Sequence, residues 1–394
     1  MQQLSILGAT GSIGQSTLDV VSRHPNKFKI VGLSAHKNID MLVAQAKQFD
    51  AQYIVVSDES LFTDAKNKVQ QAGLTCEVLS GNEGLCQIAS LDSVDSVMAA
   101  IVGAAGLLPT LSAVKAGKKV MLANKEALVM CGEIFVNEVN RSGAQLLPID
   151  SEHNAIFQCL PADYEYGNIA ASGIAKILLT GSGGPFLTTP LNHFENITPE
   201  QACAHPNWDM GRKISVDSAT MMNKGLEFIE AKWLFGVACE DIDIVLHPQS
   251  IIHSMVQYTD GSVLAQLGNP DMRTPIAHCL SYPKRIDSGV PHLDFNRLAD
   301  FTFTKPDFER YPNLQTAIEA CKAGQYATTA LNAANEVSVA AFLDGRIRFT
   351  DIALINQAVT DSIPAQKLAD VDAILALDAE ARSLAQQYLL RSAS

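Results

Sequence analysis

The first 150 residues alternate between short apolar runs and segments with helical periodicity. The runs that we predict to be strands are Leu4–Leu7, Phe28–Leu33, Tyr53–Val56, Val97–Ile101, Lys119–Leu122 and Gln145–Pro148. Helical spacing of apolar residues fills most of the gaps, as in Gln15–Arg23 and Lys125–Asn140. Nearly continuous apolar strands that alternate with helices are typical of a parallel sheet with helices on both faces. The pattern therefore predicts a doubly wound α/β domain over residues 1–149.

After Asp150 the pattern changes to glycine-rich loops, one long helix and short alternating strands. Met221–Phe235 has helical periodicity, and the strands are expected at Ile242–His247, His253–Tyr258 and Val263–Leu267. Asp260-Gly261, between the last two strands, is a strong signal for a hairpin turn. We therefore predict a central α+β domain with an antiparallel sheet over residues 150–281. We expect the open edge or face of this sheet to carry a homodimer contact.

The last part of the chain reads as a linker followed by helices. Residues 282–307 are rich in proline and polar side chains, which is typical of a linker. Helical periodicity then recurs in Leu314–Ala323, Ala327–Leu343, Asp351–Ser362 and Ile374–Leu390. The simplest interpretation is a C-terminal helical bundle over residues 308–394.

Composition and charge exclude several classes of protein. The chain has 394 residues with a formal net charge of -13 and no basic stripe, so we expect no binding to nucleic acid. Its most apolar run, Val97–Leu108, is shorter than the ~20 residues that cross a bilayer, and the N-terminus lacks a signal-peptide pattern. The eight cysteines are scattered without a C-x-x-C pair, which favours reduced thiols. We therefore expect a cytoplasmic protein that does not bind membranes.

A glycine-rich segment follows the first predicted strand and opens the first predicted helix. Gly8–Gly14 has the spacing G-x-x-G-x-x-G, a variant of the dinucleotide fingerprint of Rossmann-like domains. Gly8 suits a tight turn, Gly11 allows a pyrophosphate to approach the backbone, and Gly14 allows close packing of helix on strand. The helix N-terminus would then face the phosphates. The alternative is a purely structural turn, but further strand-helix units behind the motif favour nucleotide binding.

The end of the second predicted strand bears on the choice of coenzyme. NAD-binding domains usually place an acidic residue there for the ribose hydroxyls. Here the positions after the strand hold His36, Lys37 and Asn38, a cation and an amide among them. This favours the 2′-phosphate of NADP, although Lys37 could also be a solvated surface charge.

Carboxylates gather in two places along the chain. Asp150 and Glu152 flank Ser151 at the end of a predicted strand, where open α/β sheets bind ligands. Two such close carboxylates suggest a hard divalent cation or an acid/base pair, although Asp150 or Ser151 could instead cap a helix. A third acid could come from Glu227 or Glu230 of the predicted helix, and spacing does not choose between them.

A second glycine-rich segment has the composition of an anion site. Thr180–Phe186 can present backbone N–H groups to an anion, and Ser218, Asn223 and Lys224 offer further donors. His205 and Trp208 lie in a loop within the segment 182–212. A tryptophan in a loop suggests a flap that closes over a ligand, or else a side chain that pins the loop to the core.

Together these motifs closely resemble the 1-deoxy-D-xylulose 5-phosphate reductoisomerase family. The resemblance covers nearly the whole chain. The matching segments, in family order, are Gly8–Gly14, Ala123–Glu126, Asp150–Asn154, Thr180–Phe186, His205–Trp208, Met221–Glu227 and Leu331–Glu336. One position departs from the family pattern, because His36 stands where many relatives have glycine before Lys-Asn.

The resemblance implies a role for each matching residue. It implies Mg²⁺ or Mn²⁺ held by Asp150, Glu152 and Glu227, which decides against Glu230; with Lys125, these would be the catalytic residues. The implied substrate contacts are Ser151, Glu152, Ser182, His205, Trp208, Ser218, Asn223, Lys224 and Glu227. The implied NADPH site consists of Gly8, Thr10, Gly11, Ser12, Ile13, Gly14, Lys37, Asn38, Asn124, Lys125, Glu126 and Gly211.

The implied reaction turns 1-deoxy-D-xylulose 5-phosphate, a small sugar phosphate, into 2-C-methyl-D-erythritol 4-phosphate. This is a step of the non-mevalonate route to isoprenoid precursors. The carbon skeleton rearranges to a branched aldehyde, which NADPH reduces. Two rival interpretations are a metal-independent NADP dehydrogenase and an inactive NADP sensor. The first needs no metal triad and the second predicts substituted ligands, whereas all three acids are present.

Overall fold

The computed structural model describes residues 1–204, 208, 211–298 and 300–392. The chain forms two compact units, which we call the first and the second unit. The first unit comprises Met1–Ala127, Phe135–Asn154 and Asp271–Pro291, and the second comprises Leu128–Ile134, Ala155–Pro270 and His292–Ser394. Each unit has its own sheet, and each is described separately below.

A seven-stranded parallel sheet forms the centre of the first unit. Its strands are β1 (Gln2–Leu7), β2 (Phe28–Ala35), β3 (Tyr53–Val56), β4 (Glu77–Ser80), β5 (Ser96–Ala99), β6 (Lys119–Leu122) and β7 (Gln145–Pro148). Their order is β4-β3-β2-β1-β5-β6-β7, so the direction of winding reverses between β1 and β5. This confirms the predicted doubly wound sheet and places the reversal, where such sheets bind ligands, at the loop after β1.

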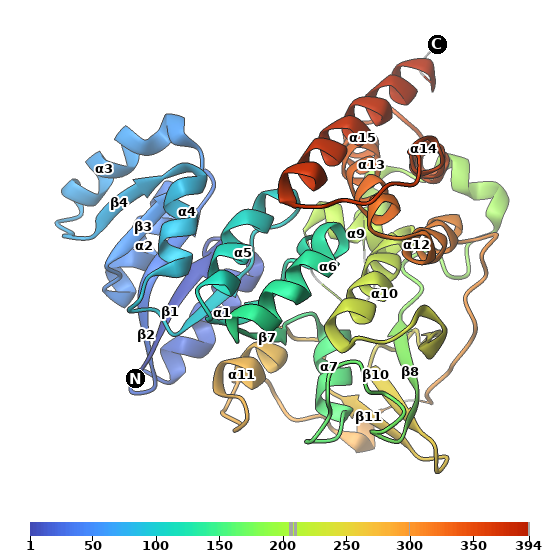
Figure 1. Ribbon diagram of the computed structural model, residues 1–394, viewed down its shortest axis with the longest axis horizontal. Coiled ribbons are helices and arrows are strands. Elements are labelled where there is room, and N and C mark those ends of the chain that lie inside the picture. Colours follow the sequence, from blue (N-terminus) through green and yellow to red (C-terminus); the bar gives the residue numbers. More distant parts are fainter. Residues whose placement is uncertain (205–207, 209–210, 299, 393–394) are drawn as a thin grey trace. The chain divides into compact units, whose positions relative to one another are not determined.

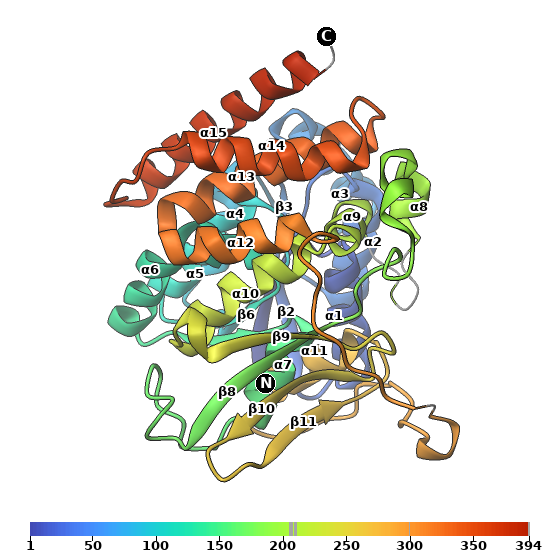
Figure 2. The same ribbon diagram turned by 90° about the vertical axis from the view of Figure 1, so that its right-hand side faces the viewer.

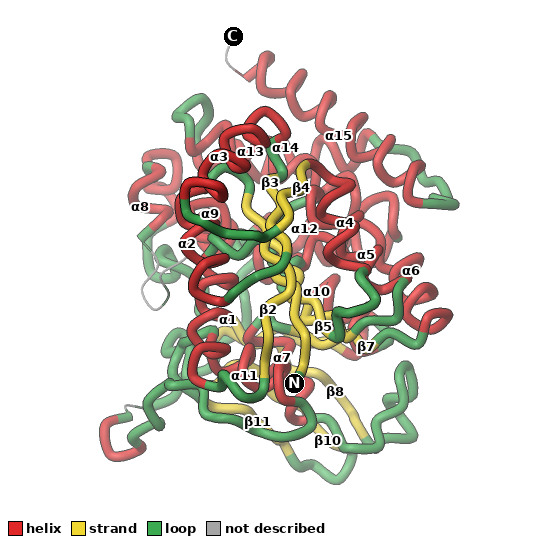
Figure 3. The backbone as a smooth tube through the Cα atoms, turned by 90° about the vertical axis from the view of Figure 1, so that its left-hand side faces the viewer, coloured by secondary structure: helices red, strands yellow, loops and turns green. Residues whose placement is uncertain are grey.

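Helices cover both faces of this sheet, because its strands are apolar on both sides. The helices of this part of the chain are α1 (Ser12–Arg23), α2 (Ile39–Phe49), η1 (Glu59–Leu61), α3 (Phe62–Gln71), α4 (Gly81–Ser90), η2 (Ala104–Gly106), α5 (Leu107–Lys115), α6 (Lys125–Ser142) and α11 (Arg273–Ser281). Figure 3 shows α1, α2 and α3 on one side of the sheet, with α4 and α5 on the other. The late helix α11 packs on α1 and on β6 and β7.

The second unit contains a mixed four-stranded sheet in the order β11-β10-β8-β9. Its strands are β8 (Ile174–Gly181), β9 (Ile242–Leu246), β10 (Ile252–Tyr258) and β11 (Val263–Leu267). The predicted hairpin at Asp260-Gly261 joins β10 and β11, and β10 is antiparallel to β8 as well. The prediction of a wholly antiparallel sheet was wrong for β9, which runs parallel to β8. A long helical connection between these two strands permits the parallel pairing.

Helices dominate the rest of the second unit. They are α7 (Ser151–Cys159), η3 (Leu191–Asn196), α8 (Pro199–Cys203), α9 (Arg212–Ala219), α10 (Met222–Phe235), η4 (Cys239–Asp241), η5 (Phe295–Arg297), α12 (Pro312–Ala323), α13 (Gln325–Leu343), α14 (Phe349–Ser362) and α15 (Val371–Ser392). The first residues of α7 belong to the first unit. Figure 2 shows α10 between the sheet and α12, where its apolar side chains join one buried cluster with β8.

The C-terminal helices form the predicted bundle. In Figure 1, α13, α14 and α15 lie side by side, and their contact is lined by small and branched residues. Alanines such as Ala330, Ala334 and Ala381 are fully buried there, which allows the helix backbones to approach closely. Within the described part of the chain, no helix is both long and apolar enough to cross a membrane.

Candidate functional site

The loop between β1 and α1 has the shape that the glycine pattern predicts. Gly8 has a φ of +87°, and a Cβ on it would lie 2.7 Å from the carbonyl oxygen of Ala100, which follows β5. A Cβ on Gly14 would lie 2.4 Å from the carbonyl oxygen of Gly8, so only glycine lets the helix start this close to the strand. Gly11 is the N-cap of α1 and offers no side chain to its first turn. The N–H groups of that turn therefore face the switch point of the sheet.

The residues after β2 border the same end of the sheet. The Asn38 side chain accepts a hydrogen bond from the Met41 N–H at 3.3 Å and so caps α2. The Lys37 side chain is 67% exposed, with its Nζ 3.8 Å from Asp58. His36 Nδ1 lies 3.0 Å from the Ser57 hydroxyl. Bonds from Ser60 and the nearby charges of Lys37 and His36 lower the pKa of Asp58. A cation and an imidazole are thus exposed beside the edge of the sheet where the coenzyme is predicted to bind.

Asn124 joins the loops that follow β5 and β6. It is buried, caps α6 by accepting from the Ala127 N–H at 2.7 Å, and donates to the carbonyl oxygens of Ile101 and Gly103. Glu126, one residue into the helix, is also buried. Asn124 therefore has a structural role in the first unit as well as its predicted place in the coenzyme site.

Asp150 and Glu152 lie at the carboxyl end of β7, as predicted. Lys125 Nζ is 2.5 Å from Asp150 Oδ2, and both side chains are almost buried. Burial alone would raise the pKa of Asp150, but the charges of Lys125 and His153 outweigh it and hold the pKa well below its usual range. The Ser151 hydroxyl donates to Glu152 at 2.5 Å, and the carboxylate oxygens of Asp150 and Glu152 lie within 4.8 Å of each other. The result is a close pair of carboxylates, and Lys125 holds the Asp150 member ionised.

Asn154 fixes the start of α7 against α11. Its Nδ2 donates to the Pro148 carbonyl at 2.9 Å and lies 3.2 Å from both His278 Nδ1 and Cys279 Sγ. Burial first, then the charges of Arg285 and Lys119, lower the pKa of His278 to about 4. A neutral imidazole can accept the Asn154 hydrogen bond. Sequence analysis missed this support because the residues that form it are more than a hundred positions apart.

In the second unit, the glycine loop after β8 packs against the other predicted phosphate contacts. Gly183 and Gly184 have φ values of +82° and +69°, and the Ser182 hydroxyl accepts from the Gly184 N–H at 3.0 Å. A Cβ on Gly184 would lie 2.6 Å from the Ser218 carbonyl oxygen. A Cβ on Gly181 would lie 2.8 Å from Lys224 Cε. The predicted set of Ser182, Ser218 and Lys224 therefore comes together around one loop.

Glu227 lies beside this loop on α10. It is 1% exposed, and both the Asn223 side-chain amide and the Lys224 ammonium donate to its carboxylate. Glu230, one turn further along, is equally buried. The three residues that share a helix face in the sequence, Asn223, Lys224 and Glu227, thus form one connected group.

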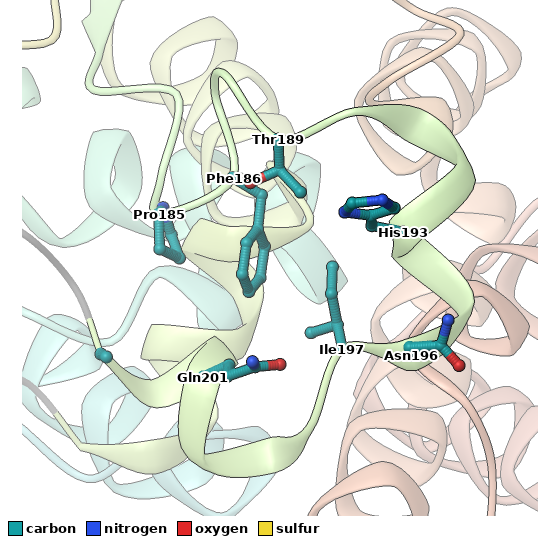
Figure 4. A pocket seen from close by; sticks show the side chains of 8 residues that line it. Pro185, Phe186, Thr189, His193, Asn196, Ile197 and Gln201 are labelled. Atoms are coloured by element: carbon teal, nitrogen blue, oxygen red, sulfur yellow. The ribbon is translucent and has the colours of Figure 1, made fainter.

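The predicted flap is only partly described. His205 lies outside the described residues. Trp208 is described, and its ring centroid lies 6.0 Å from that of His253 on β10. Gly211 is the N-cap of α9. A separate pocket of about 600 Å³ lies between Phe186, Ile197 and Gln201, which all belong to the predicted flap segment 182–212 (Figure 4). Two of its lining residues, Pro185 and Phe186, belong to the segment Thr180–Phe186 that was predicted to bind an anion, and none was predicted individually as a site residue.

Three stretches of the chain match families with one activity. Residues 4–132 match "1-deoxy-D-xylulose 5-phosphate reductoisomerase", residues 146–235 match its C-terminal domain, and residues 267–384 match "DXP reductoisomerase C-terminal domain". The chain belongs to the 1-deoxy-D-xylulose 5-phosphate reductoisomerase family. It is therefore an enzyme, and the family named from the sequence motifs is confirmed.

Relatives of this family match the chain from end to end. The reductoisomerase of Colwellia psychrerythraea is 61% identical over 98% of this chain and 96% of its own. That of Glaesserella parasuis is 56% identical over 99% of this chain and all of its own. A DOX-P reductoisomerase solved with NADPH, fosmidomycin and magnesium has a TM-score of 0.96 at 48% identity, covering 99% of this chain and 98% of its own. The Zymomonas mobilis reductoisomerase, solved with NADPH, has a TM-score of 0.90 at 46% identity, with coverage of 98% and 99%.

Some residues that shape the site carried no signal in the sequence. The Tyr311 hydroxyl donates to the Gly183 carbonyl at 2.8 Å and supports the glycine loop from the N-cap position of α12. The Ser34 hydroxyl accepts from the Gly8 N–H at 2.9 Å at the other loop. Both residues act through a backbone group far away in the chain, and only tertiary structure reveals such contacts.

Proposed function

We propose that the chain binds NADPH and Mg²⁺ or Mn²⁺ and converts 1-deoxy-D-xylulose 5-phosphate into 2-C-methyl-D-erythritol 4-phosphate. The observation that carries this assignment is the close carboxylate pair of Asp150 and Glu152 beside Lys125, at the carboxyl end of β7. We propose that this pair binds the metal ion at the point where the substrate reacts.

The donor set fits a hard divalent cation. Asp150 and Glu152 offer carboxylate oxygens only, and Lys125 keeps Asp150 ionised, as a metal ligand must be. We propose Glu227 as the third ligand, on the strength of the sequence resemblance and its position beside Lys224. The bound cation would supply positive charge to the substrate carbonyl and hydroxyl oxygens.

The glycine loop fits a dinucleotide. The close approaches at Gly8 and Gly14 leave a cradle at the N-terminus of α1 that a Cβ would fill. We propose that NADPH lies there and supplies the hydride. The other proposed contacts are Thr10, Gly11, Ser12, Ile13, Lys37, Asn38, Asn124, Lys125, Glu126 and Gly211.

We assign the substrate phosphate to the glycine loop of the second unit. Ser182, Ser218, Asn223 and Lys224 supply hydroxyl, amide and ammonium donors around it. The phosphate is remote from the reacting carbons, so its binding energy can orient the substrate and favour closure of the flap that carries His205 and Trp208. Closure excludes water from the reactive aldehyde. Lys125 and Ser151 act at the carbonyl and hydroxyl groups, where Lys125 stabilises developing negative charge.

The test is NADPH oxidation by the purified protein on addition of 1-deoxy-D-xylulose 5-phosphate, before and after chelation. We expect consumption that requires both the substrate and added Mg²⁺ or Mn²⁺. Glu227→Gln should lower turnover by about a hundredfold or more while NADPH still binds. Glu230→Gln, an equally buried acid on the same helix, is the matched control and should keep most of the activity. If Glu230→Gln loses activity and Glu227→Gln keeps it, Glu230 is the metal ligand. NADPH consumption that needs no metal would contradict the mechanism.

We also propose a division of the chain and a homodimer. Residues 1–149 would bind NADPH, 150–281 would carry metal and substrate groups with a flap at 182–212, 282–307 would link, and 308–394 would form the helical domain. The dimer is supported by β11, an edge strand whose Val263 and Leu264 are about half exposed.

We further propose a cytoplasmic location. No disulfide joins any of the eight cysteines in the described part of the chain, not even Cys239 and Cys321, whose sulfur atoms lie only 3.3 Å apart. Close thiols that remain unbonded are in keeping with a reducing compartment. Cell fractionation with antibody detection would test the location, and recovery outside the cytoplasmic fraction would contradict it.

A further inference from the structure

A chain of hydrogen bonds crosses the core of the second unit between its C-terminal helices. Asn356 Nδ2 on α14 donates to Asn313 Oδ1 on α12 at 2.9 Å and to Asn335 Oδ1 on α13 at 3.0 Å. The Ser338 hydroxyl donates to Asn356 Oδ1 at 2.8 Å. All four side chains are at most 2% exposed. Polar groups so deeply buried are costly unless paired, so this arrangement demands one relative position of the three helices.

The chain of bonds ends on a buried carboxylate. Asn335 Nδ2 donates to Asp217 Oδ1 at 2.8 Å, and Lys213 Nζ lies 2.8 Å from Asp217 Oδ2. Asp217 is 1% exposed, whereas the Lys213 side chain is 25% exposed. Each oxygen of the carboxylate thus has its own donor, one from α9 and one from α13. Removing the Asn335 amide would leave an ionised oxygen buried with fewer hydrogen bonds.

Asp217 immediately precedes the segment to which we assigned the substrate phosphate. Its carbonyl oxygen accepts from the Thr220 hydroxyl at 3.2 Å, and that hydroxyl accepts from the Met222 N–H at 3.3 Å. Met221, which lies between Thr220 and Met222, has a φ of +59°, a backbone conformation that residues other than glycine rarely adopt. This strained turn joins Ser218 at the end of α9 to Asn223 and Lys224 at the start of α10. It persists only because its surroundings hold it.

The same turn also fixes the glycine loop. The Ser218 carbonyl lies where a Cβ on Gly184 would be 2.6 Å away, so a shift of α9 would change the packing of the loop that carries Ser182. All the proposed phosphate donors therefore depend on where Asp217 is held. The motif Leu331–Glu336 resembled the family but had no assigned role. It contains Asn335, the residue that holds Asp217 in place.

We propose that Asn335 is a positioning residue for the substrate phosphate. It acts through Asp217, which sets Ser218 and the turn that leads to Asn223 and Lys224. Asn356 orients the Asn335 amide by donating to its oxygen, so that its nitrogen faces Asp217. This inference rests on the proposed function, because the phosphate role of the segment belongs to that proposal.

The test changes first one and then both partners of the hydrogen bond between Asn335 and Asp217. Asn335→Asp places a second carboxylate against Asp217, and at pH 8 the like charges should move α9 and raise KM for the sugar phosphate by about ten- to a hundredfold. The turnover number and the Kd for NADPH should change by less than about threefold. The double variant Asp217→Asn, Asn335→Asp restores one donor facing one acceptor and should bring KM back to within about threefold of the unmodified enzyme.

A matched control separates positioning from loss of stability. Asn332→Asp makes the same change three residues earlier on α13, at a side chain that is fully buried and donates to Glu336 at 3.3 Å. It should lower the melting temperature without raising KM. If Asn335→Asp fails to fold, Asn335→Ser, which keeps a hydroxyl donor, serves in its place and should raise KM by a smaller factor.

The outcomes are distinguishable from failure of the phosphate assignment itself. Lys224→Ala should raise KM in the same assay, and an unchanged KM there would overturn the proposed phosphate site. If Lys224→Ala raises KM but Asn335→Asp does not, or if the double variant gives no rescue, the positioning role is wrong. If Asn332→Asp raises KM as much as Asn335→Asp does, the hydrogen bonds of Asn335 only stabilise the fold and have no specific effect on the phosphate site.

Discussion

At the scale of single residues, the charges of the proposed site are paired before any ligand arrives. Lys125 keeps Asp150 ionised, and Asn223 with Lys224 surrounds Glu227. A carboxylate that remains ionised needs no proton loss when a cation binds, which favours binding at neutral pH. The net charge of -13 is therefore no obstacle to an anionic substrate, because local donors decide its binding.

The glycines of the first loop give a residue-scale prediction. A Cβ on Gly11 would meet only the Gly8 carbonyl, at 3.4 Å, whereas one on Gly14 would lie 2.4 Å from the same oxygen. Gly11→Ala should therefore leave the melting temperature unchanged but raise the Kd for NADPH by about tenfold, because the methyl group occupies the path of the pyrophosphate. Gly14→Ala should lower the melting temperature.

Differential scanning fluorimetry and a fluorescence titration with NADPH would measure both variants of this pair. An unchanged Kd for Gly11→Ala would mean that the pyrophosphate does not approach the backbone at this position. A normal melting temperature for Gly14→Ala would contradict the close packing of α1 on β1.

At the scale of elements, the sequence predicted those that are long or apolar. Six of the seven parallel strands and the four C-terminal helices follow directly from periodicity. The seventh strand, β4, was missed because it is short, lies at the sheet edge and begins at the exposed Glu77. β8 was missed because Lys176 interrupts its apolar run and the glycine loop follows at once.

The site residues also fall into two groups, those that local sequence patterns predict and those that they do not. Gly8–Gly14 and Asp150–Glu152 were predictable because local spacing alone places them at strand ends. Asp217, Asn335 and Tyr311 were not, since each acts by contacting a group far away in the chain. Long-range contacts of single polar side chains leave no periodic pattern in a sequence.

The late helix α11 leads to a prediction about pH. His278 on α11 is buried, and its pKa of about 4 is below the ~6.5 of an unfolded histidine. Its contribution to stability is complete above pH ~6.5 and is lost as the pH falls toward 4, because the unfolded chain then binds the proton more readily. Between pH 7 and 5 this group should lower the free energy of unfolding by about 2 kcal/mol.

Urea unfolding at several pH values would measure this dependence. His278→Gln keeps an acceptor for Asn154 but cannot take up a proton, so it should show a shallower loss of stability over that range. His292→Gln, at an exposed histidine, is the control and should keep the slope of the unmodified protein. Identical slopes for all three proteins would mean that His278 is protonated as easily in the folded state as in the unfolded chain.

At the scale of the whole molecule, hydrogen bonds of the second unit join the proposed phosphate site to the C-terminal bundle. The bundle supplies Asn335 and Asn356, and Tyr311, the residue before α12, supports the glycine loop. A helical domain with no predicted catalytic residue therefore contributes to the geometry of the site.

The open edge of the second sheet gives a whole-molecule prediction. β11 pairs with β10 on one side only among the described strands, and its sequence VLAQL has no charge to discourage pairing with another chain. Val263 and Leu264 are 46% and 51% exposed. A second copy that adds its own edge strand would satisfy the backbone groups and cover these side chains in a two-fold symmetric contact.

Size-exclusion chromatography with light scattering would measure the mass in solution. The unmodified protein should run as a dimer of its 42.3 kDa chain, and the double variant Val263→Lys, Leu264→Lys as a monomer, because the introduced charges repel across a symmetric strand pair. Leu354→Lys, at a 64% exposed leucine on α14, is the matched control and should remain a dimer. A monomeric unmodified protein would contradict the dimer, and a dimeric double variant would place the contact on another surface.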